Sequence, residues 1–316
     1  MKIVLAGGSG QLGQVLRRAY EEFGHEIVIL SRSASGGPGV VRWDGRSLGA
    51  WAGEVDGADV VINLAGRSVN CRYTKTTRTE MFASRVDSTR VIGQAIGRAK
   101  RPPFVWLQSS TATIYSHRFD APNDELTGIV GGAEPDVPPY WRASIEIAQA
   151  WERTLQDAAT PQTRKVALRS AMVMGPERGG VFHVLSTLAR FGLGGPVAGG
   201  RQFVSWIHER DFVRATEFLL ARDDLDGPVN LAAPAPLPQR VFMRALRHAV
   251  GARVGLPATA WMVGVGAYFL RTDPELILKS RYVAPRRLMD AGFEFEFPTW
   301  PDAARDLAAR SRKQKN

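Results

Sequence analysis

A glycine-rich stretch near the start of the chain is the first feature with a chemical use. Apolar residues of strand length, Lys2 to Ala6, precede it, and apolar residues at helical spacing follow from Gln11 to Phe23. Glycines three residues apart allow a tight turn, close approach of the backbone to a pyrophosphate and close helix packing. The pattern predicts a dinucleotide-binding turn, with a purely structural turn as the lesser alternative. The predicted cofactor-binding residues are Gly7, Ser9, Gly10, Gln11, Leu12 and Gly13.

The end of the next apolar run distinguishes the two nicotinamide cofactors. An Asp or Glu at that place binds the ribose 2′-hydroxyl of NAD, whereas this chain has Ser31-Arg32-Ser33. A carboxylate would repel a 2′-phosphate, and the Arg32 guanidinium offers several donors to one. The sequence therefore predicts NADP(H) in preference to NAD(H), with Arg32 as an ordinary surface charge as the alternative. Further cofactor contacts are predicted at Ser31, Asp44, Asn63, Leu64, Ala65 and Gly66.

These residues need a sheet to position them. Continuous rather than alternating apolar runs recur between helical stretches, which indicates a parallel sheet covered by helices on both faces. We expect an α/β fold, a doubly wound parallel sheet of the Rossmann type with a smaller α+β substrate lobe toward the C-terminus. The runs are Glu26 to Leu30, Val40 to Trp43, Asp59 to Leu64, Phe104 to Gln108 and Val166 to Arg169.

The pattern changes after residue 172. Glycine-rich loops such as Gly192 to Gly200 follow, with several helices and short strands near Phe203 to Ile207 and Val229 to Leu231. We predict an NADP-binding Rossmann domain over 1–172, which later helices and a strand can complete. A substrate lobe and C-terminal helical region is predicted over 173–310, and a solvated, frayed basic tail over 311–316.

Composition narrows the class of protein. The 316 residues are 44% hydrophobic and 23% charged, as in ordinary globular proteins. The net charge of +10 comes from basic residues scattered through every segment, so an acidic small ligand fits it as well as nucleic acid would. A single cysteine, Cys71, and an N-terminus without a secretory signal pattern favour a cytoplasmic protein. No histidine or cysteine spacing predicts a metal site.

The longest uncharged run extends from Val254 to Leu270 and contains Pro257 and three glycines. It is shorter than the roughly 20 apolar residues that a membrane-spanning helix needs. We expect an amphipathic or buried helix that covers a lobe. A peripheral membrane role is the lesser alternative.

Three motifs in order resemble the extended short-chain dehydrogenase/reductase superfamily, which includes sugar-nucleotide epimerases. They are the glycine loop, Asn63-Leu64-Ala65-Gly66 and the stretch from Ser109 to Tyr115. Later motifs are similar to an atypical subgroup, epimerase-family proteins that end in a small C-terminal domain of uncharacterised function. The resemblance covers residues 1–308. The later motifs are Ser84 to Arg90, Gly194 to Pro196, Phe203 to His208, and Pro285 to Leu288 followed by Ala291 to Phe293.

The resemblance implies a chemistry in which a tyrosine transfers a proton while a nicotinamide exchanges hydride. A hydroxyl orients the substrate, and a lysine four residues after the tyrosine lowers its pKa. By motif the hydroxyl falls on Thr111 and the tyrosine on Tyr140, but Ser144 stands at the lysine position. Tyr140 as a packed aromatic and Thr111 as a cap are the structural alternatives.

We therefore predict an NADP(H)-binding oxidoreductase or epimerase-like enzyme, with a non-catalytic regulator or scaffold as the alternative because the lysine is missing. The expected partner is a small hydroxyl or carbonyl compound, with anionic compounds among the candidates. We expect no nucleic acid and no membrane span, and a homodimer is left open. Substrate contacts are expected at Tyr115, Arg201 and His208, where a local hydrogen bond is the alternative for His208, and Arg178, Arg190 and Arg281 are further cations for an anionic substrate.

Overall fold

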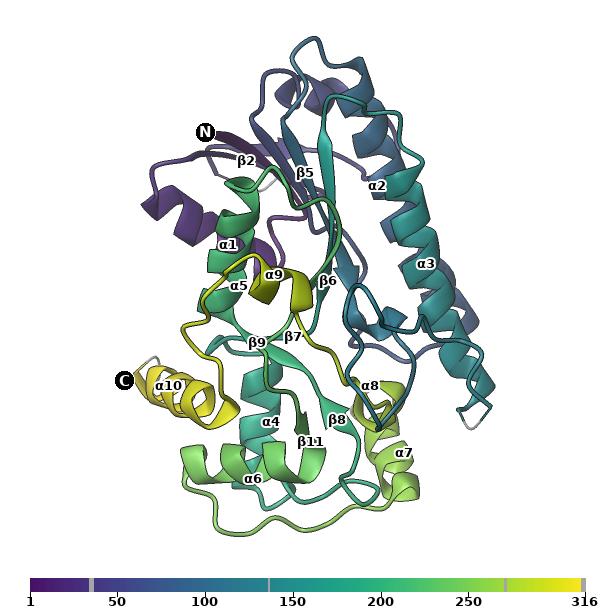
Figure 1. The fold of residues 1–316 in the computed structure, drawn as a ribbon, viewed down its shortest axis with the longest axis vertical. Helices are drawn as coiled ribbons and strands as arrows, with labels where there is room; N and C mark the ends of the chain where they lie inside the picture. Colours follow the sequence, from purple (N-terminus) through teal and green to yellow (C-terminus); the bar gives the residue numbers. More distant parts are fainter. Residues whose placement is uncertain (34–36, 136, 270–271, 314–316) are drawn as a thin grey trace.

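A seven-stranded parallel sheet organises the first part of the chain (Figure 1). The structure is a computed structural model, and it describes residues 1–33, 37–135, 137–269 and 272–313. The strand order is β3-β2-β1-β4-β5-β6-β10, with the reversal beside β1 that a doubly wound fold requires. The strands are β1 (Lys2–Ala6), β2 (Glu26–Ser31), β3 (Val40–Arg42), β4 (Val60–Asn63), β5 (Val105–Thr111), β6 (Arg164–Ser170) and β10 (Gly227–Leu231).

Helices cover both faces of this sheet, as the continuous apolar runs predicted. On one face α1 (Gln11–Glu22) and α5 (Glu209–Leu220) enclose a core around Leu5, Leu16 and Phe212. On the other face α2 (Lys75–Arg98) and α3 (Arg142–Gln156) lie side by side in Figure 1. The predicted fold class is confirmed.

The last strand of the sheet comes from far along the chain. Val229 to Leu231, which the sequence pattern placed with the second lobe, belongs to β10 and pairs in parallel with β6. The chain leaves β6, builds part of the second lobe, and returns along α5 to the sheet edge. The sequence allowed a later strand to complete the sheet domain, and β10 does so. Which apolar run would supply that strand could not be predicted, because a short apolar strand does not reveal its neighbour.

The second lobe contains two small strand pairs and a helical core. In parallel pairing, β7 (Met172–Met174) lies beside β9 (Trp206–His208), and β8 (Phe203–Val204) pairs antiparallel with β11 (Leu237–Pro238). Buried aromatic rings, among them Trp206 and Trp300, fill the space between the helices. The helices are α4 (Val181–Arg190), α6 (Gln239–Val250), α7 (Ala260–Phe269), α8 (Glu275–Leu278), α9 (Arg286–Asp290) and α10 (Trp300–Lys313), and the 3₁₀ helices η1 (Ala50–Glu54), η2 (Ala112–Ile114) and η3 (Pro139–Trp141) belong to the sheet domain.

The basic C-terminal stretch is not a frayed tail where the structure describes it. Helix α10 continues to Lys313. Arg310 pairs with Glu209 of α5, and the Ser311 hydroxyl donates to the Pro176 carbonyl at 3.4 Å. Residues 311–313 of the predicted tail are therefore helical, and residues 314–316 lie outside the described residues.

The long uncharged run also differs from its prediction. Its helix, α7, is only 10 residues long, and its outward residues Trp261 and Val265 are exposed. An amphipathic helix would place polar residues there, whereas this face is apolar. Among the described residues, no helix is both long enough and apolar enough to cross a membrane.

Candidate functional site

The glycine loop joins β1 to α1 at the carboxyl edge of the sheet. Gly7 has φ +75°, and a Cβ on it would lie 2.8 Å from the Ala65 backbone nitrogen. A Cβ on Gly13 would lie 2.4 Å from the Gly8 Cα. Side chains are thus excluded at both places, and the backbone at the N-terminus of α1 stays open to a pyrophosphate. Ser9, Gly10 and Gln11 are exposed there, while Leu12 packs against the core.

Asn63 supports the loop that faces Gly7. Its side chain is fully buried, its Oδ1 accepts the Ala65 amide at 3.0 Å, and its Nδ2 donates to Gln108 Oε1 at 3.0 Å. In the same way the Ser84 hydroxyl on α2 accepts the Arg67 amide at 2.9 Å. Asn63 therefore holds Leu64 to Gly66 in place rather than presenting its own amide at the surface.

A hollow of about 650 Å³ opens at the ends of β2 and β3. Arg32 and Arg42 both line it, and the strand register places Arg42 beside Ser31. Both side chains belong to exposed residues, and neither has a hydrogen bond or ion pair in the described part of the chain. Two unpaired guanidinium groups at one hollow suit a phosphate group. The other lining residues are Trp43, Asp44, Arg46, Ser47, Leu48, Gly49, Ala50 and Trp51.

Ser31 and Asp44 shape this hollow from inside. The Ser31 hydroxyl is buried and lies 3.4 Å from the Ser9 hydroxyl, so it links the second strand to the glycine loop. Asp44 Oδ1 accepts the amides of Arg46 and Ser47 at 2.8 and 2.9 Å. The Ser47 hydroxyl and then these amides lower the pKa of Asp44 to about 2. Asp44 is therefore a fixed, charged turn residue on the wall.

Arg42 was not predicted from the sequence, because it lies within the third strand and only strand pairing brings it beside Arg32. Replacement of Arg42 by Ala is expected to weaken NADPH binding about tenfold, the worth of one exposed charge-assisted phosphate contact. NADH lacks the 2′-phosphate, so its affinity should not change. Parallel fluorescence titrations measure both, and an equal loss for the two cofactors would remove Arg42 from the phosphate site.

A second cluster of polar groups lies at the same edge of the sheet, just after β5. The Lys279 ammonium donates to the Thr113 carbonyl at 2.8 Å, and Arg281 Nε donates to the Thr113 hydroxyl at 3.2 Å. The Ser144 hydroxyl on α3 donates to Glu275 Oε2 at 2.7 Å. The C-terminal segment after α7 therefore supplies three charged side chains beside Thr113 and Ser144.

Two atoms in this cluster lack internal partners. Arg281 Nη2 and Glu275 Oε1 are buried and have no hydrogen bond among the described residues. Burial raises the pKa of Glu275, and burial followed by the Arg281 charge lowers the pKa of Lys279 to about 8. A cavity of about 250 Å³ between Gly132 and the start of α3 reaches Lys279. Buried polar atoms without a partner are uncommon in folded proteins, which makes this cluster a candidate ligand site.

The predicted catalytic residues are placed less favourably. The Thr111 hydroxyl accepts the Thr113 amide at 3.1 Å and so caps η2, the structural role foreseen for it, although it stays at the carboxyl end of β5. Tyr140 lies in η3, 38% exposed, with its ring edge against Trp141. No described hydrogen bond joins Tyr140 to Thr111 or Ser144. The role of Tyr140 therefore stays a prediction that its position does not support.

The three expected substrate contacts lie elsewhere. Tyr115 is 2% exposed, and its hydroxyl accepts from Arg169 at 2.8 Å and donates to Asn230 at 3.0 Å. His208 is fully buried, its Nδ1 accepts the Arg210 amide that opens α5, and its Nε2 faces Asp306 at 3.1 Å. Burial lowers the pKa of the His208 imidazole, and the Asp306 carboxylate acts in the opposite direction. Arg201 is exposed in the second lobe. Internal hydrogen-bond partners thus occupy the polar groups of Tyr115 and His208.

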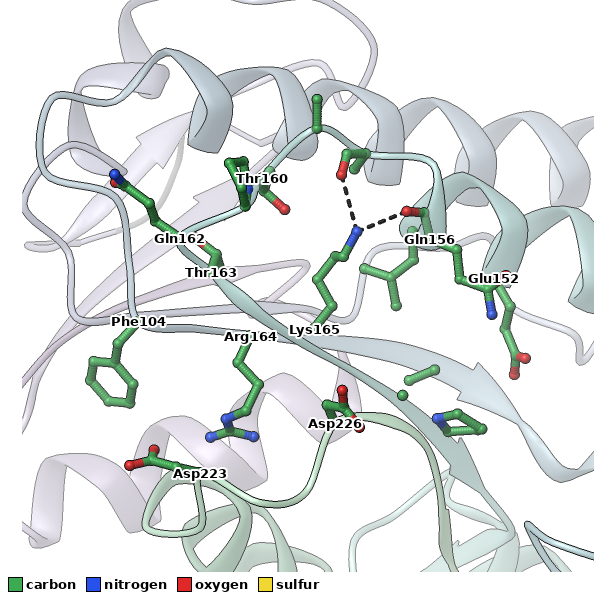
Figure 2. Close-up of a pocket in the computed structure, with 17 residues that line it drawn as sticks. Phe104, Glu152, Gln156, Thr160, Gln162, Thr163, Arg164, Lys165, Asp223 and Asp226 are labelled. Atoms are coloured by element: carbon green, nitrogen blue, oxygen red, sulfur yellow. Dashed lines mark hydrogen bonds between the residues drawn. The ribbon is translucent and has the colours of Figure 1, made fainter.

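A further cavity lies away from both clusters. It has a volume of about 950 Å³ and lies at the amino ends of β5, β6 and β10. Figure 2 shows Lys165 in it, bonded to the carbonyls of Gln156 and Ala158 at 2.8 and 3.0 Å. Parallel sheets bind ligands at the carboxyl ends of their strands. In this cavity, backbone carbonyls of the chain already accept the hydrogen bonds of the Lys165 ammonium. We therefore place the site at the opposite edge.

Comparisons with known proteins give the fold and the family of this chain. The crystal structure of human epimerase family protein SDR39U1 (isoform2) with NADPH has a TM-score of 0.85 and 28% identity, covering 98% of this chain and 99% of that one. A nucleoside-diphosphate sugar epimerase from Corynebacterium glutamicum, 22% identical with a TM-score of 0.74, covers 100% of this chain and 61% of that one and shares the fold.

The sequence relatives carry the same family description. Human "Epimerase family protein SDR39U1" is 28% identical over 312 residues, 98% of this chain and 100% of that protein. "Epimerase family protein SSP1921" of Staphylococcus saprophyticus is 30% identical over 310 residues, 96% of this chain and 98% of that protein. A family described as "Domain of unknown function (DUF1731)" matches residues 258–307. Residues 3–232 match the "NAD dependent epimerase/dehydratase family", so the chain belongs to that family.

Proposed function

We propose that this protein is an NADP(H)-dependent oxidoreductase or epimerase-like enzyme that acts on a small anionic hydroxyl or carbonyl compound. One observation carries the proposal. Arg32 and Arg42 of the cofactor hollow, and Arg281 Nη2 of the second cluster, have no hydrogen-bond partner among the described residues and lie at the same carboxyl edge of one sheet. The NADPH in the crystal structure of the human relative supports the choice of cofactor.

The chain's residues fit this cofactor. Gly7 and Gly13 leave the backbone open at the start of α1, and the two arginines offer donors to a 2′-phosphate. When bound, NADP(H) supplies or accepts a hydride. NADP(H) is preferred over NAD(H) because arginines stand where NAD-binding proteins have the carboxylate that binds the ribose 2′-hydroxyl.

The substrate would lie against the cluster that follows β5. Arg281 Nη2 donates to an anionic group of the substrate, while its Nε and Nη1 atoms hold Thr113 and the Leu276 carbonyl. Thr111 orients the reacting oxygen. The pKa values of Lys279 and Glu275 are both shifted toward neutrality. Either side chain can therefore take up or release the proton whose transfer the lysine of the family motif would assist.

Replacement of Arg281 by Lys tests the anionic substrate. A planar two-nitrogen donor becomes a single ammonium, so KM for carboxylate- or phosphate-bearing carbonyl compounds should rise about tenfold or more. The KM of uncharged carbonyl compounds should not change. Loss of reduced nicotinamide absorbance measures turnover of a panel of both kinds.

Two controls separate binding from folding. NADPH titration should give the same affinity for Arg281→Lys as for the unchanged chain, because Arg281 is not in the cofactor hollow. Arg153→Lys, at an exposed arginine later on α3, should leave all constants unchanged. An equal effect of Arg281→Lys on charged and uncharged compounds would show a structural role only.

A non-catalytic NADP(H)-binding regulator is the second candidate. The observation in its favour is Ser144 at the lysine position, bound to Glu275 rather than facing Tyr140. NADPH binding without turnover of any compound in the panel, by a chain of unchanged thermal stability, would favour it over the enzyme.

A further inference from the structure

We propose that the far end of the second lobe binds the surface of an anionic lipid bilayer. This end comprises the loop after α4, the loop after α6, and α7, here called the lobe tip (residues 190–198 and 253–268). Figure 1 shows α6 and α7 at the end of the molecule farthest from α1 and β2. The proposal is independent of the proposed function, because none of these residues belongs to the cofactor hollow.

The sequence of this region carries no carboxylates. From Arg178 to His208, and again from Gly227 to Thr272, there is no Asp or Glu. Arginines occur throughout both stretches, so the region is cationic at any pH near neutral. The exposed arginines described in these two stretches are Arg178, Arg190, Arg201, Arg240, Arg244 and Arg253, of which Arg190 and Arg253 belong to the lobe tip.

Large apolar side chains are exposed between these arginines. Trp261 on α7 is 70% exposed, and Phe191 in the loop after α4 is 77% exposed. Singly, exposed apolar residues need no explanation, but a group of this size marks an interaction surface. The exposed group also contains Leu193, Val254, Leu256, Met262, Val265 and Tyr268, which are 43% to 61% exposed.

This exposed apolar group is the patch of the lobe tip, and backbone hydrogen bonds join its two loops. The Leu256 amide donates to the Gly192 carbonyl at 2.7 Å, and the Ala258 amide donates to the Pro196 carbonyl at 2.9 Å. The loops after α4 and α6 therefore lie side by side, and α7 begins two residues after Ala258. Arg190 and Arg253 each directly precede an exposed apolar residue of the patch.

Charge decides the kind of partner. A second copy would place the same patch against itself in a twofold dimer, so arginines would meet arginines with no carboxylate in either stretch to pair with them. An anionic bilayer supplies phosphate groups for the arginines, apolar depth for Phe191 and Leu256, and the interfacial position that Trp and Tyr favour. The lobe tip fits a bilayer better than it fits itself.

Vesicle sedimentation with the full chain tests this. Vesicles of phosphatidylcholine with phosphatidylglycerol should bind the protein, and vesicles of phosphatidylcholine alone should bind it at least about tenfold more weakly. Binding should weaken as salt is raised, because exposed charges are screened. Replacing both Arg190 and Arg253 by Gln should weaken binding to the anionic vesicles by about 25-fold, or about fivefold for each charge.

The apolar contribution has its own variant and control. Trp261→Ser should reduce binding to anionic vesicles about tenfold. Phe23→Ser removes an aromatic ring that is 54% exposed at the end of α1, on the other domain, and should change nothing. Thermal stability and NADPH affinity should be unchanged in all three variants.

Three results would overturn the proposal. The protein could fail to sediment with anionic vesicles, or it could sediment equally with uncharged ones. Light scattering could also reveal a dimer that Trp261→Ser dissociates, which would assign the patch to a second copy of the chain.

Discussion

Gly13→Ala is expected to weaken NADPH binding by about 100-fold and to lower the free energy of unfolding by about 3 kcal/mol. Helix propensity alone predicts the opposite, since alanine is a better helix former than glycine by about 1 kcal/mol. Packing decides against propensity here. The new Cβ would lie 2.4 Å from the Gly8 Cα and 2.6 Å from its carbonyl atoms, which are backbone and cannot turn away. The glycine loop must then shift, and the pyrophosphate contacts shift with it.

Gly264→Ala is the matched control for this variant. Gly264 is also inside a helix, α7, but a Cβ added to it would meet no other atom within 4 Å. Only helix propensity should act at this position, so the free energy of unfolding should stay equal or rise slightly. The affinity for NADPH should not change. Chemical denaturation and cofactor titration measure the two effects. A Gly13→Ala protein that bound NADPH normally would show that this turn does not carry the cofactor.

Glu152→Gln is expected to destabilise the protein by about 3 kcal/mol, or about 5 °C in Tm for a chain of this length. Glu152 is 6% exposed and accepts from Arg169 Nε at 2.9 Å and from Nη2 at 2.7 Å. Arg169 is 9% exposed. The glutamine amide carries no charge, so the Arg169 guanidinium stays buried without a counterion. Removing one partner of a buried ion pair lowers stability more than replacing both partners. The network also holds the Tyr115 hydroxyl, which accepts from Arg169 Nη1 at 2.8 Å.

Glu146→Gln on the same helix is the control. Glu146 is exposed, so the same chemical change should alter the free energy of unfolding by no more than about 0.5 kcal/mol. Adding Arg169→Met to Glu152→Gln should recover part of the loss, because the unpaired charge is then gone. Equal stability of the two single variants would contradict a buried ion pair at this place.

The sheet and the cofactor turn could be predicted because their signals are local. The glycine spacing, the apolar strand before it and the missing carboxylate at Arg32 all lie within a few tens of residues. The return of the chain to the sheet is not local, so the sequence allowed for a later strand but could not identify β10 as that strand. Arg42 was missed for the same reason, since only pairing of β2 with β3 brings it to the hollow.

The second cluster shows most clearly what could not be predicted from the sequence. Motif alignment pointed to Tyr140 and Ser144, which are close in sequence. The structure instead brings Glu275, Lys279 and Arg281 to Thr113 and Ser144 from more than 130 residues away. Arg281 was one of four arginines considered for an anionic substrate, and nothing in the sequence separated it from the exposed Arg178 and Arg190. Burial and an unpaired Nη2 atom do separate it.

The most direct test of the account is a parallel titration of the purified chain with NADPH and NADH, followed by nicotinamide fluorescence. The same titration is made with the double variant Arg32→Ala, Arg42→Ala. The account predicts tighter binding of NADPH than of NADH, and a double variant that loses about 100-fold for NADPH alone. Equal affinity for the two cofactors, or no binding of either, would contradict it.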